Sequence, residues 1–278
     1  MMPLPVPRLS CLPVSLYAAL GDGSLDLAGW FALAREAGLD GADLSVLHLA
    51  RASAADLDAI ARAARDAGVA VPMLVSYPDF THPDARVRAA QRDDLRRWIE
   101  VAWRLGVGAI RITAGQAHPE TREADGLRWA AHGLTGCLDE ARAAGVALLF
   151  ENHVRGTPWR HHDFSQPAAR FLALLDATAG SSLGVLFDTA NPLVLRDDPQ
   201  ELLDRALPRV VAVHLSDIRR AGSFEPVLLG DGVAPLADLL VQLRAGGFAG
   251  WFSIEEASRG GADGVRRAAE RARRLLAP

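Results

Sequence analysis

Four hydrophobic runs in the second half of the chain each end at one ionisable residue. These terminal residues are Glu151, Asp188, His214 and Glu255. Burying several such groups together is costly unless something compensates them. A divalent cation does so, because it turns carboxylate repulsion into shared attraction. Three carboxylates and one imidazole suit an oxygen-preferring or borderline ion, so we predict one bound divalent metal ion: Mn²⁺, Mg²⁺ or Co²⁺.

Further polar residues near the ends of such runs could act on a substrate. His153 comes two residues after Glu151, so along a strand its side chain projects to the same side. It could serve as a third acid or base, or as a hydrogen-bonding residue behind the site. Trp159 stands beside an arginine in the following loop and suits stacking on a sugar face. His48 ends another run and could contact a substrate.

The elements that would position these residues follow a repeating pattern. Amphipathic stretches end in glycine, which is favoured just past a helix end, and a short apolar run follows at once. Continuous apolar runs of strand length are typical of parallel strands buried on both faces. The pattern predicts strands near 9–16, 41–47, 69–76, 108–113, 146–152, 183–188, 209–215 and 250–255, and helices near 24–37, 53–67, 84–105, 121–144, 165–179, 198–206, 234–246 and 262–276.

Eight strand-then-helix units in roughly 250 residues have the size and order of an α/β protein of the (β/α)8 TIM barrel type. We predict one such domain over residues 1–278. An open doubly wound sheet also alternates strands and helices, but no G-x-G-x-x-G motif follows the first strand. In such barrels the active site lies at the carboxyl ends of the strands, which is where the four predicted metal ligands are located.

The composition excludes several classes of function. All 30 basic residues are arginine, which excludes lysine Schiff-base chemistry and phosphate-binding loops that end in Gly-Lys. The net charge is −4 with no basic run, so we expect no nucleic-acid partner. Cys11 and Cys137 alone cannot form a disulfide framework. No run approaches the roughly twenty apolar residues of a membrane span, and we predict a soluble, cytoplasmic protein.

Motifs at several strand ends resemble those of the xylose isomerase-like TIM-barrel superfamily. They are Arg111–Gly115, His214–Asp217, Leu229–Gly232 and Trp251–Glu255, with the order Glu, Asp, His, Glu at strands five to eight. The chain is most similar to the sugar phosphate isomerase/epimerase type, which includes ketose 3-epimerases, hydroxypyruvate isomerases and inosose dehydratases. The resemblance implies that the four residues bind one divalent metal and that Glu151 and Glu255 also move protons.

Two more candidate substrate-binding residues come from the resemblance. Arg220 stands six residues after His214, where the family has an arginine. Asn191 stands where ketose 3-epimerases have a substrate-contacting histidine, and the loop 155–159 lacks their further glutamate. The match to the superfamily is therefore specific, whereas the match to one activity is not.

Together these residues suit proton transfer on a small sugar or related polyhydroxy carbonyl compound. A metal that chelates carbonyl and hydroxyl oxygens acidifies the adjacent C–H, and carboxylates can move the proton through a metal-stabilised enediolate. We therefore predict a divalent-metal-dependent isomerase or epimerase. The alternatives are a lyase or dehydratase acting on a keto-sugar or keto-cyclitol, and a non-catalytic sugar-binding barrel. A small-molecule carbohydrate is the expected partner, and a homo-oligomer is compatible with the sequence.

Overall fold

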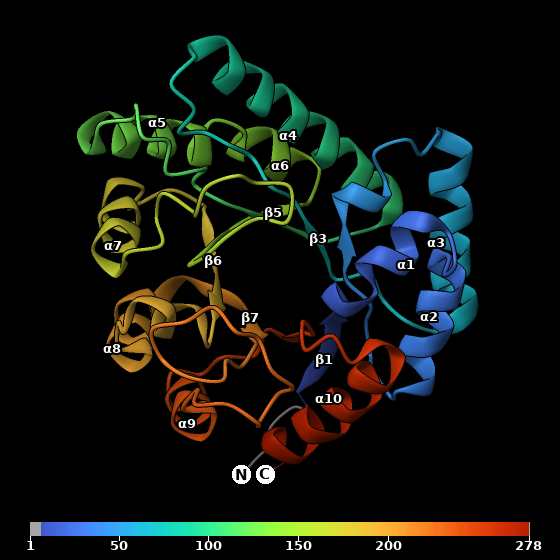
Figure 1. Ribbon diagram of the computed structural model, residues 1–278. Helices are drawn as coiled ribbons and strands as arrows, with labels where there is room; N and C mark the ends of the chain where they lie inside the picture. The colour runs from blue at the N-terminus through green and yellow to red at the C-terminus, as the bar shows by residue number, and fades with distance from the viewer. Residues whose placement is uncertain (1–6, 278) are drawn as a thin grey trace.

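Eight parallel β-strands form the centre of the protein in the computed structural model, which describes residues 7–277. Figure 1 shows the helices as a ring around these strands. Within the described residues the strands are β1 (Arg8–Leu12), β2 (Leu44–Ser45), β3 (Met73–Val75), β4 (Ala109–Ile112), β5 (Ala147–Glu151), β6 (Gly184–Asp188), β7 (Val210–Leu215) and β8 (Trp251–Glu255). They pair in the order β1-β8-β7-β6-β5-β4-β3-β2, which confirms the predicted (β/α)8 barrel.

The remaining gap in the barrel, between β1 and β2, is bridged by single backbone hydrogen bonds. The N–H of Asp43, just before β2, donates to the carbonyl of Cys11 at 2.9 Å, and the N–H of Asp40 donates to the carbonyl of Leu9 at 2.8 Å. Because β2 has only two residues in a regular ladder, these bonds carry the contact between the two strands. The strands therefore form a nearly closed cylinder.

The helices connect successive strands and end close to the predicted glycine junctions. In the described chain they are α1 (Tyr17–Asp22), α2 (Leu27–Glu36), α3 (Ala54–Ala67), α4 (Ala85–Leu105), α5 (Glu123–Thr135), α6 (Leu138–Ala143), α7 (Ala168–Ala177), α8 (Pro199–Ala206), α9 (Leu236–Ala245) and α10 (Gly261–Leu276). Gly68 and Gly106 end α3 and α4 with φ of 70° and 72°, the left-handed conformation that glycine adopts at least cost. No helix within residues 7–277 is long and apolar enough to cross a bilayer.

Four predicted elements differ from the structure, and one of them, the predicted strand 69–76, is regular only at β3. The predicted strand 9–16 ends at Leu12 because Pro13 has no N–H with which to continue the ladder, and a 3-10 turn and α1 follow. The predicted strand 41–47 is regular only at β2. The predicted helix 121–144 is two helices, α5 and α6, separated at Gly136, where the low helix propensity of glycine lets the chain turn.

Side chains alternate between the two sides of the barrel wall, and this alternation directs the predicted ligands inward. The residues that pack outward against the helices include Phe150, Phe187 and Val213. The residues that fill the barrel interior are Leu12, Met73, Val75, Leu149, Leu186 and Ala212. Because neighbouring residues in a strand face opposite sides, Glu151, Asp188 and His214, which follow the outward residues, face the interior beside this small apolar core.

Candidate metal centre

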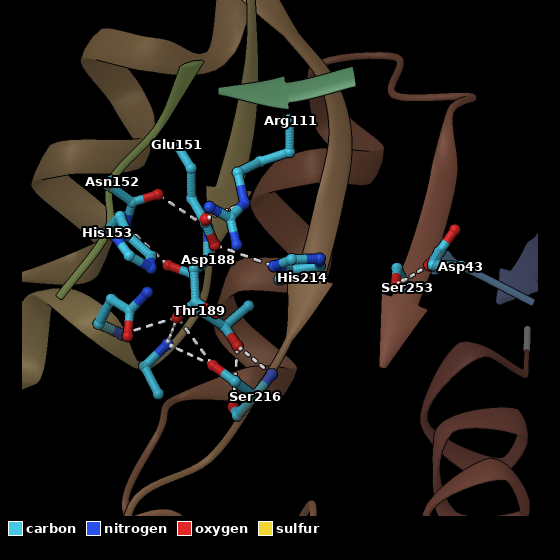
Figure 2. Close-up of polar contacts among 12 residues, drawn as sticks. Asp43, Arg111, Glu151, Asn152, His153, Asp188, Thr189, His214, Ser216 and Ser253 are labelled. Atoms are coloured by element: carbon cyan, nitrogen blue, oxygen red, sulfur yellow. Dashed lines mark hydrogen bonds and ion pairs between the residues drawn. The ribbon is translucent and has the colours of Figure 1, made fainter. Parts of the chain in front are cut away.

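The structure brings the four predicted ligands together at one end of the barrel interior. Ligand atoms of Glu151, Asp188, His214 and Glu255 all lie within 4.8 Å of one another. The two glutamates and the aspartate end their strands, and His214 is the penultimate residue of β7. Three of the side chains are completely buried, and Glu255 is partly exposed. Figure 2 shows Glu151, Asp188 and His214 gathered beside Arg111.

Neighbouring groups hold these side chains in place. Nδ1 of His214 lies 2.9 Å from Oε1 of Glu151. Oδ1 of Asp188 accepts a hydrogen bond from Oγ of Ser216 at 2.7 Å and from two backbone N–H groups of the following turn at 2.9 and 2.7 Å. Oε1 of Glu151 and Oδ1 of Asp188 are therefore engaged in hydrogen bonds, and their second oxygens are not.

Three buried atoms at this place have no hydrogen-bond partner among the described residues. They are Oε2 of Glu151, Oδ2 of Asp188 and Nε2 of His214. An unsatisfied buried polar atom costs free energy unless an ion or ligand satisfies it. Carboxylate oxygens and imidazole nitrogens are the ligand types that ions such as Mn²⁺ and Co²⁺ accept. The residues present therefore fit the metal ion that the sequence predicts.

Burial and mutual charge move the pKa values of these groups apart. Burial raises the pKa of Asp188, and the carboxylates of Glu255 and Glu151 raise it further, to about 8. Burial opposes the charge of Glu151 as well, but Arg111 and His214 outweigh it and lower the pKa of Glu151 to about 2. Burial disfavours the charged form of His214, yet the Glu151 carboxylate raises its pKa to about 9. The centre therefore carries protons that a bound cation would displace.

Arg111 on β4 belongs to this centre and was not predicted as a site residue. Its Nε lies 3.0 Å from Oε2 of Glu151, where the two charges attract without the alignment of a hydrogen bond. Its Nη1 donates to the carbonyl of Ser76 at 2.7 Å, and the guanidinium lies over the ring of Tyr77. The side chain is only 1% exposed. A lone arginine within an apolar strand was the available signal, since a buried cation requires a partner.

The side chains of Glu151, Asp188, His214 and Glu255 are called the metal group below. His153 forms a second polar pair next to this group. Its Nδ1 lies 3.2 Å from Oδ2 of Asp163, and Oδ1 of Asp163 accepts hydrogen bonds from the N–H and Oγ of Ser165 at 2.7 and 2.6 Å. Burial raises the pKa of Asp163, and the contact with His153 opposes that rise. The carboxylate fixes the orientation of the imidazole ring. Asp163 was not predicted, because nothing in the loop sequence indicates this pairing.

A cavity of 370 Å³ opens at this end of the barrel. Its walls include Arg111, His153, Asn191, Ser216 and Glu255. The volume lies in the range of small-molecule sites. His153 and Glu255 thus both face the space that a ligand would occupy, whereas the fully buried Glu151 is not among the lining residues of the described chain.

The predicted substrate residues Asn191 and Trp159 take different positions. Asn191 lines the cavity. Trp159 is buried behind His153, with the ring centroids 5.5 Å apart, and its Nε1 donates to the carbonyl of Tyr77 at 3.3 Å. Trp159 therefore packs against His153 and is not among the residues that line the described cavity.

Arg220 and His48 also lie outside the cavity wall formed by the described residues. The side chain of Arg220 is 70% exposed and pairs with Glu225 at 2.7 Å. His48 is half-buried after β2 and packs edge-on against Tyr17, with the ring centroids 4.9 Å apart. The loop that carries Arg220 thus turns its side chain to the solvent.

A further buried carboxylate, Asp43, lies in the barrel interior apart from the metal group (Figure 2). Its Oδ2 accepts hydrogen bonds from Oγ of Ser10 at 2.8 Å and from Oγ of Ser253 at 2.5 Å. Burial raises the pKa of Asp43, and these two bonds oppose the rise. Hydroxyl groups thus satisfy Oδ2 of Asp43, whereas its Oδ1 has no hydrogen-bond partner among the described residues.

Known proteins resemble this chain in sequence and in fold. The family model described as "Xylose isomerase-like TIM barrel" matches residues 31–276. A curated inosose dehydratase of Bacillus thuringiensis (strain Al Hakam) is 27% identical over 133 residues, which cover 41% of this chain and 42% of that protein. The match therefore spans less than half of that relative's length.

Two solved structures share the whole fold at low sequence identity. An L-ribulose 3-epimerase superposes with a TM-score of 0.78 and 20% identity, covering 97% of this chain and 94% of that one. The probable 3-DHS dehydratase AsbF from Bacillus anthracis has a TM-score of 0.76 and 15% identity, covering 95% and 97%. At these identities the likeness concerns the fold.

Proposed function

Because the chain belongs to the xylose isomerase-like TIM barrel family, we propose that it is a divalent-metal-dependent enzyme, a sugar isomerase or epimerase. Its substrate would be a small polyhydroxylated carbonyl compound. The observation that carries the proposal is the group of four side chains at the strand ends, three of whose buried oxygen and nitrogen atoms lack a hydrogen-bond partner among the described residues, beside a small-molecule cavity. The fold shared with an L-ribulose 3-epimerase is compatible with it.

Glu151, Asp188, His214 and Glu255 would hold the metal ion, of which Mn²⁺, Mg²⁺ and Co²⁺ are the candidates. A divalent cation in such a site polarises a substrate carbonyl and makes the neighbouring C–H more acidic. Arg111 keeps the carboxylate of Glu151 ionised through the ion pair at 3.0 Å. Ser216 and the turn after β6 fix the orientation of Asp188.

We assign the proton transfers to Glu255 and His153, which are among the acid/base groups that line the cavity. Glu255 removes a proton from the carbon next to the carbonyl, and His153, oriented by Asp163, returns a proton. Glu151 is suited to holding the cation and not to acting as a base, because a carboxylate with a pKa of about 2 binds a proton weakly. The resemblance implied that Glu151 also moves protons, and this assignment limits Glu151 to binding the metal.

The test is deuterium exchange measured by mass spectrometry. Protein loaded with Mn²⁺ is incubated in D₂O with a panel of ketoses and keto acids, and deuterium incorporation at carbon is recorded. We expect at least one compound to exchange, and Glu255→Gln to abolish exchange while circular dichroism shows an intact fold. Glu225→Gln, a charge-matched change at an exposed carboxylate, serves as the control. A Glu255→Gln protein that exchanges at the normal rate contradicts the assignment.

A dehydratase is the second candidate, and the pair of His153 and Asp163 favours it. An imidazole held by a buried carboxylate can donate a proton to a departing hydroxyl group, which a lyase requires and a two-carboxylate epimerase does not. The partial sequence match to an inosose dehydratase supports the same candidate. Product analysis separates the two: a product lighter by one water excludes simple isomerisation, and a product of unchanged mass excludes dehydration.

A further inference from the structure

Two of the three arginines in the cavity wall have no acidic partner. Arg111, Arg155 and Arg259 all line the cavity. Arg111 is paired with Glu151, whereas neither Arg155 nor Arg259 forms an ion pair with any carboxylate in residues 7–277. Both of the unpaired arginines are exposed to the solvent at the mouth of the cavity.

Arg155 is held in position by its own loop. Its Nε and Nη2 donate to the carbonyl of Trp159 at 3.3 and 3.2 Å, which leaves Nη1 without a partner among the described residues. The next residue, Gly156, is packed so closely that a Cβ there would meet Trp159 and Tyr77 at 2.9 Å. The guanidinium therefore projects from a fixed turn, and a ligand would find it already oriented.

Arg259 occupies a backbone conformation that favours glycine. Its φ is 65°, in the left-handed region that side chains with a Cβ rarely adopt, and its N–H donates to Oγ of Ser15 at 2.9 Å. Gly260 and Gly261 follow it directly. Strained residues of this kind often occur at ligand sites. Of the two described non-glycine residues with positive φ, Arg196 and Arg259, Arg259 lines the cavity.

The acidic residues around the cavity do not neutralise these two charges. The carboxylate of Asp217 accepts four backbone N–H groups of its own loop, those of Ile218, Gly230, Gly232 and Ala234. The three carboxylates of the metal group would be balanced by Arg111 and a divalent cation. The cavity mouth is thus left with an excess of positive charge.

We propose that the substrate carries an anionic group, a carboxylate or a phosphate, that Arg155 and Arg259 bind at the cavity mouth. The guanidinium group matches both anions in shape and charge. The substrate class is then a polyhydroxylated keto acid or a phosphorylated ketose, and a neutral sugar is excluded as the preferred ligand. The anion site rests on the proposed function in one respect, since the cavity must hold the substrate.

The test is isothermal calorimetry on Mn²⁺-loaded and metal-free protein with three probes: 2-keto-D-gluconate, D-fructose 6-phosphate and neutral D-fructose. We expect at least one anionic probe to bind the loaded protein about tenfold more tightly than D-fructose, and the two anions separate a carboxylate site from a phosphate site. Arg155→Gln and Arg259→Gln should each weaken the anionic probe roughly tenfold, the size of one charge-assisted hydrogen bond. The affinity for D-fructose should stay within about twofold.

Arg160→Gln is the matched control, because Arg160 lies exposed on the same loop and does not line the described cavity. Equal binding of all three probes, binding of none, or an equal loss in Arg160→Gln overturns the anion site. Preferred binding of an anion without any deuterium exchange upholds the anion site and overturns the proposed function. Deuterium exchange of a neutral ketose, without preferred binding of an anion, upholds the proposed function and overturns the anion site.

Discussion

At the scale of single residues, the pKa values of two neighbouring carboxyl groups are shifted in opposite directions. Arg111 lies next to Glu151 and lowers its pKa to about 2. For Asp188, burial and the charges of Glu255 and Glu151 outweigh the attraction of His214 and raise its pKa to about 8. The protein therefore keeps one ligand permanently ionised and leaves another protonated at neutral pH until a cation takes the proton's place.

Metal affinity should consequently rise with pH. Below about pH 8 a cation must displace the proton of Asp188, and below about pH 9 it must also displace that of His214, so affinity falls as the pH falls. We expect about a tenfold loss per pH unit for each displaced proton. Calorimetry of Mn²⁺ binding near pH 7 in buffers of different ionisation enthalpy counts the released protons. An affinity that is constant between about pH 6 and pH 8 contradicts this account.

At the scale of elements, the loop after β5 is positioned by the loop after β4. Oε1 of Gln116 accepts hydrogen bonds from the N–H groups of Arg160 and His161 at 2.8 and 3.0 Å. The N–H and Nε2 of Gln116 both donate to the buried carboxylate of Asp79 at 2.9 Å. Gln116 therefore helps to tie the loop that carries Asp163 to the barrel, together with the backbone hydrogen bonds from Ala117 to His162 and from Phe164 to Gly115.

Gln116→Ala should loosen this loop and leave the metal group intact. The loss of its hydrogen bonds should cost about 1–3 kcal/mol of local stability, seen as faster amide exchange over residues 153–165. We expect turnover to fall about tenfold or more while the Mn²⁺ affinity changes less than about twofold. Gln166→Ala is the control, because the Gln166 side chain lies beside the same loop and makes no hydrogen bond within residues 7–277. It should change neither the amide exchange of the loop nor the turnover. An unaltered loop in Gln116→Ala would show that Gln116 does not hold it.

The same elements show what the sequence could and could not predict. The convergence of Glu151, Asp188, His214 and Glu255 was predictable because each interrupts an apolar run at a strand end, and parallel strands bring their carboxyl ends together. Arg111 and Asp163 were not assigned, because their partners are distant in the chain or hidden within an irregular loop. Arg220 was predicted from its spacing to His214, which does not determine the direction of a loop side chain, and the structure turns it to the solvent.

At the scale of the whole molecule, the barrel gathers charge that opposes folding when no cation is bound. Three carboxylates and a histidine lie within 4.8 Å, next to an interior core of only six apolar residues in the described chain. Helix and strand positions were largely predicted from the glycine junctions, since local rules determine where a helix ends. The balance between buried charge and apolar core depends on tertiary packing and was not visible in the sequence.

A bound cation should therefore stabilise the whole barrel. At a free concentration 100 times its Kd, an ion that binds only the folded state adds about 2.7 kcal/mol, which raises the Tm by roughly 5–10 °C for a domain of this size. Thermal unfolding of chelator-treated protein with and without Mn²⁺ measures the shift. Mg²⁺ and Co²⁺ should act in the same direction, and an identical Tm in all conditions would argue against a metal bound to the folded state.

The most direct measurement is a titration of chelator-treated protein with Mn²⁺, followed by electron paramagnetic resonance of the free ion. We predict one bound ion per chain, and a loss of affinity of about 100-fold or more in Asp188→Asn. Asp43→Asn alters another fully buried carboxylate of the same barrel that lies outside the metal group, and it should keep the ion. A wild-type protein that binds no Mn²⁺, or an Asp188→Asn protein that binds it as tightly as the wild type, would contradict the proposed metal centre.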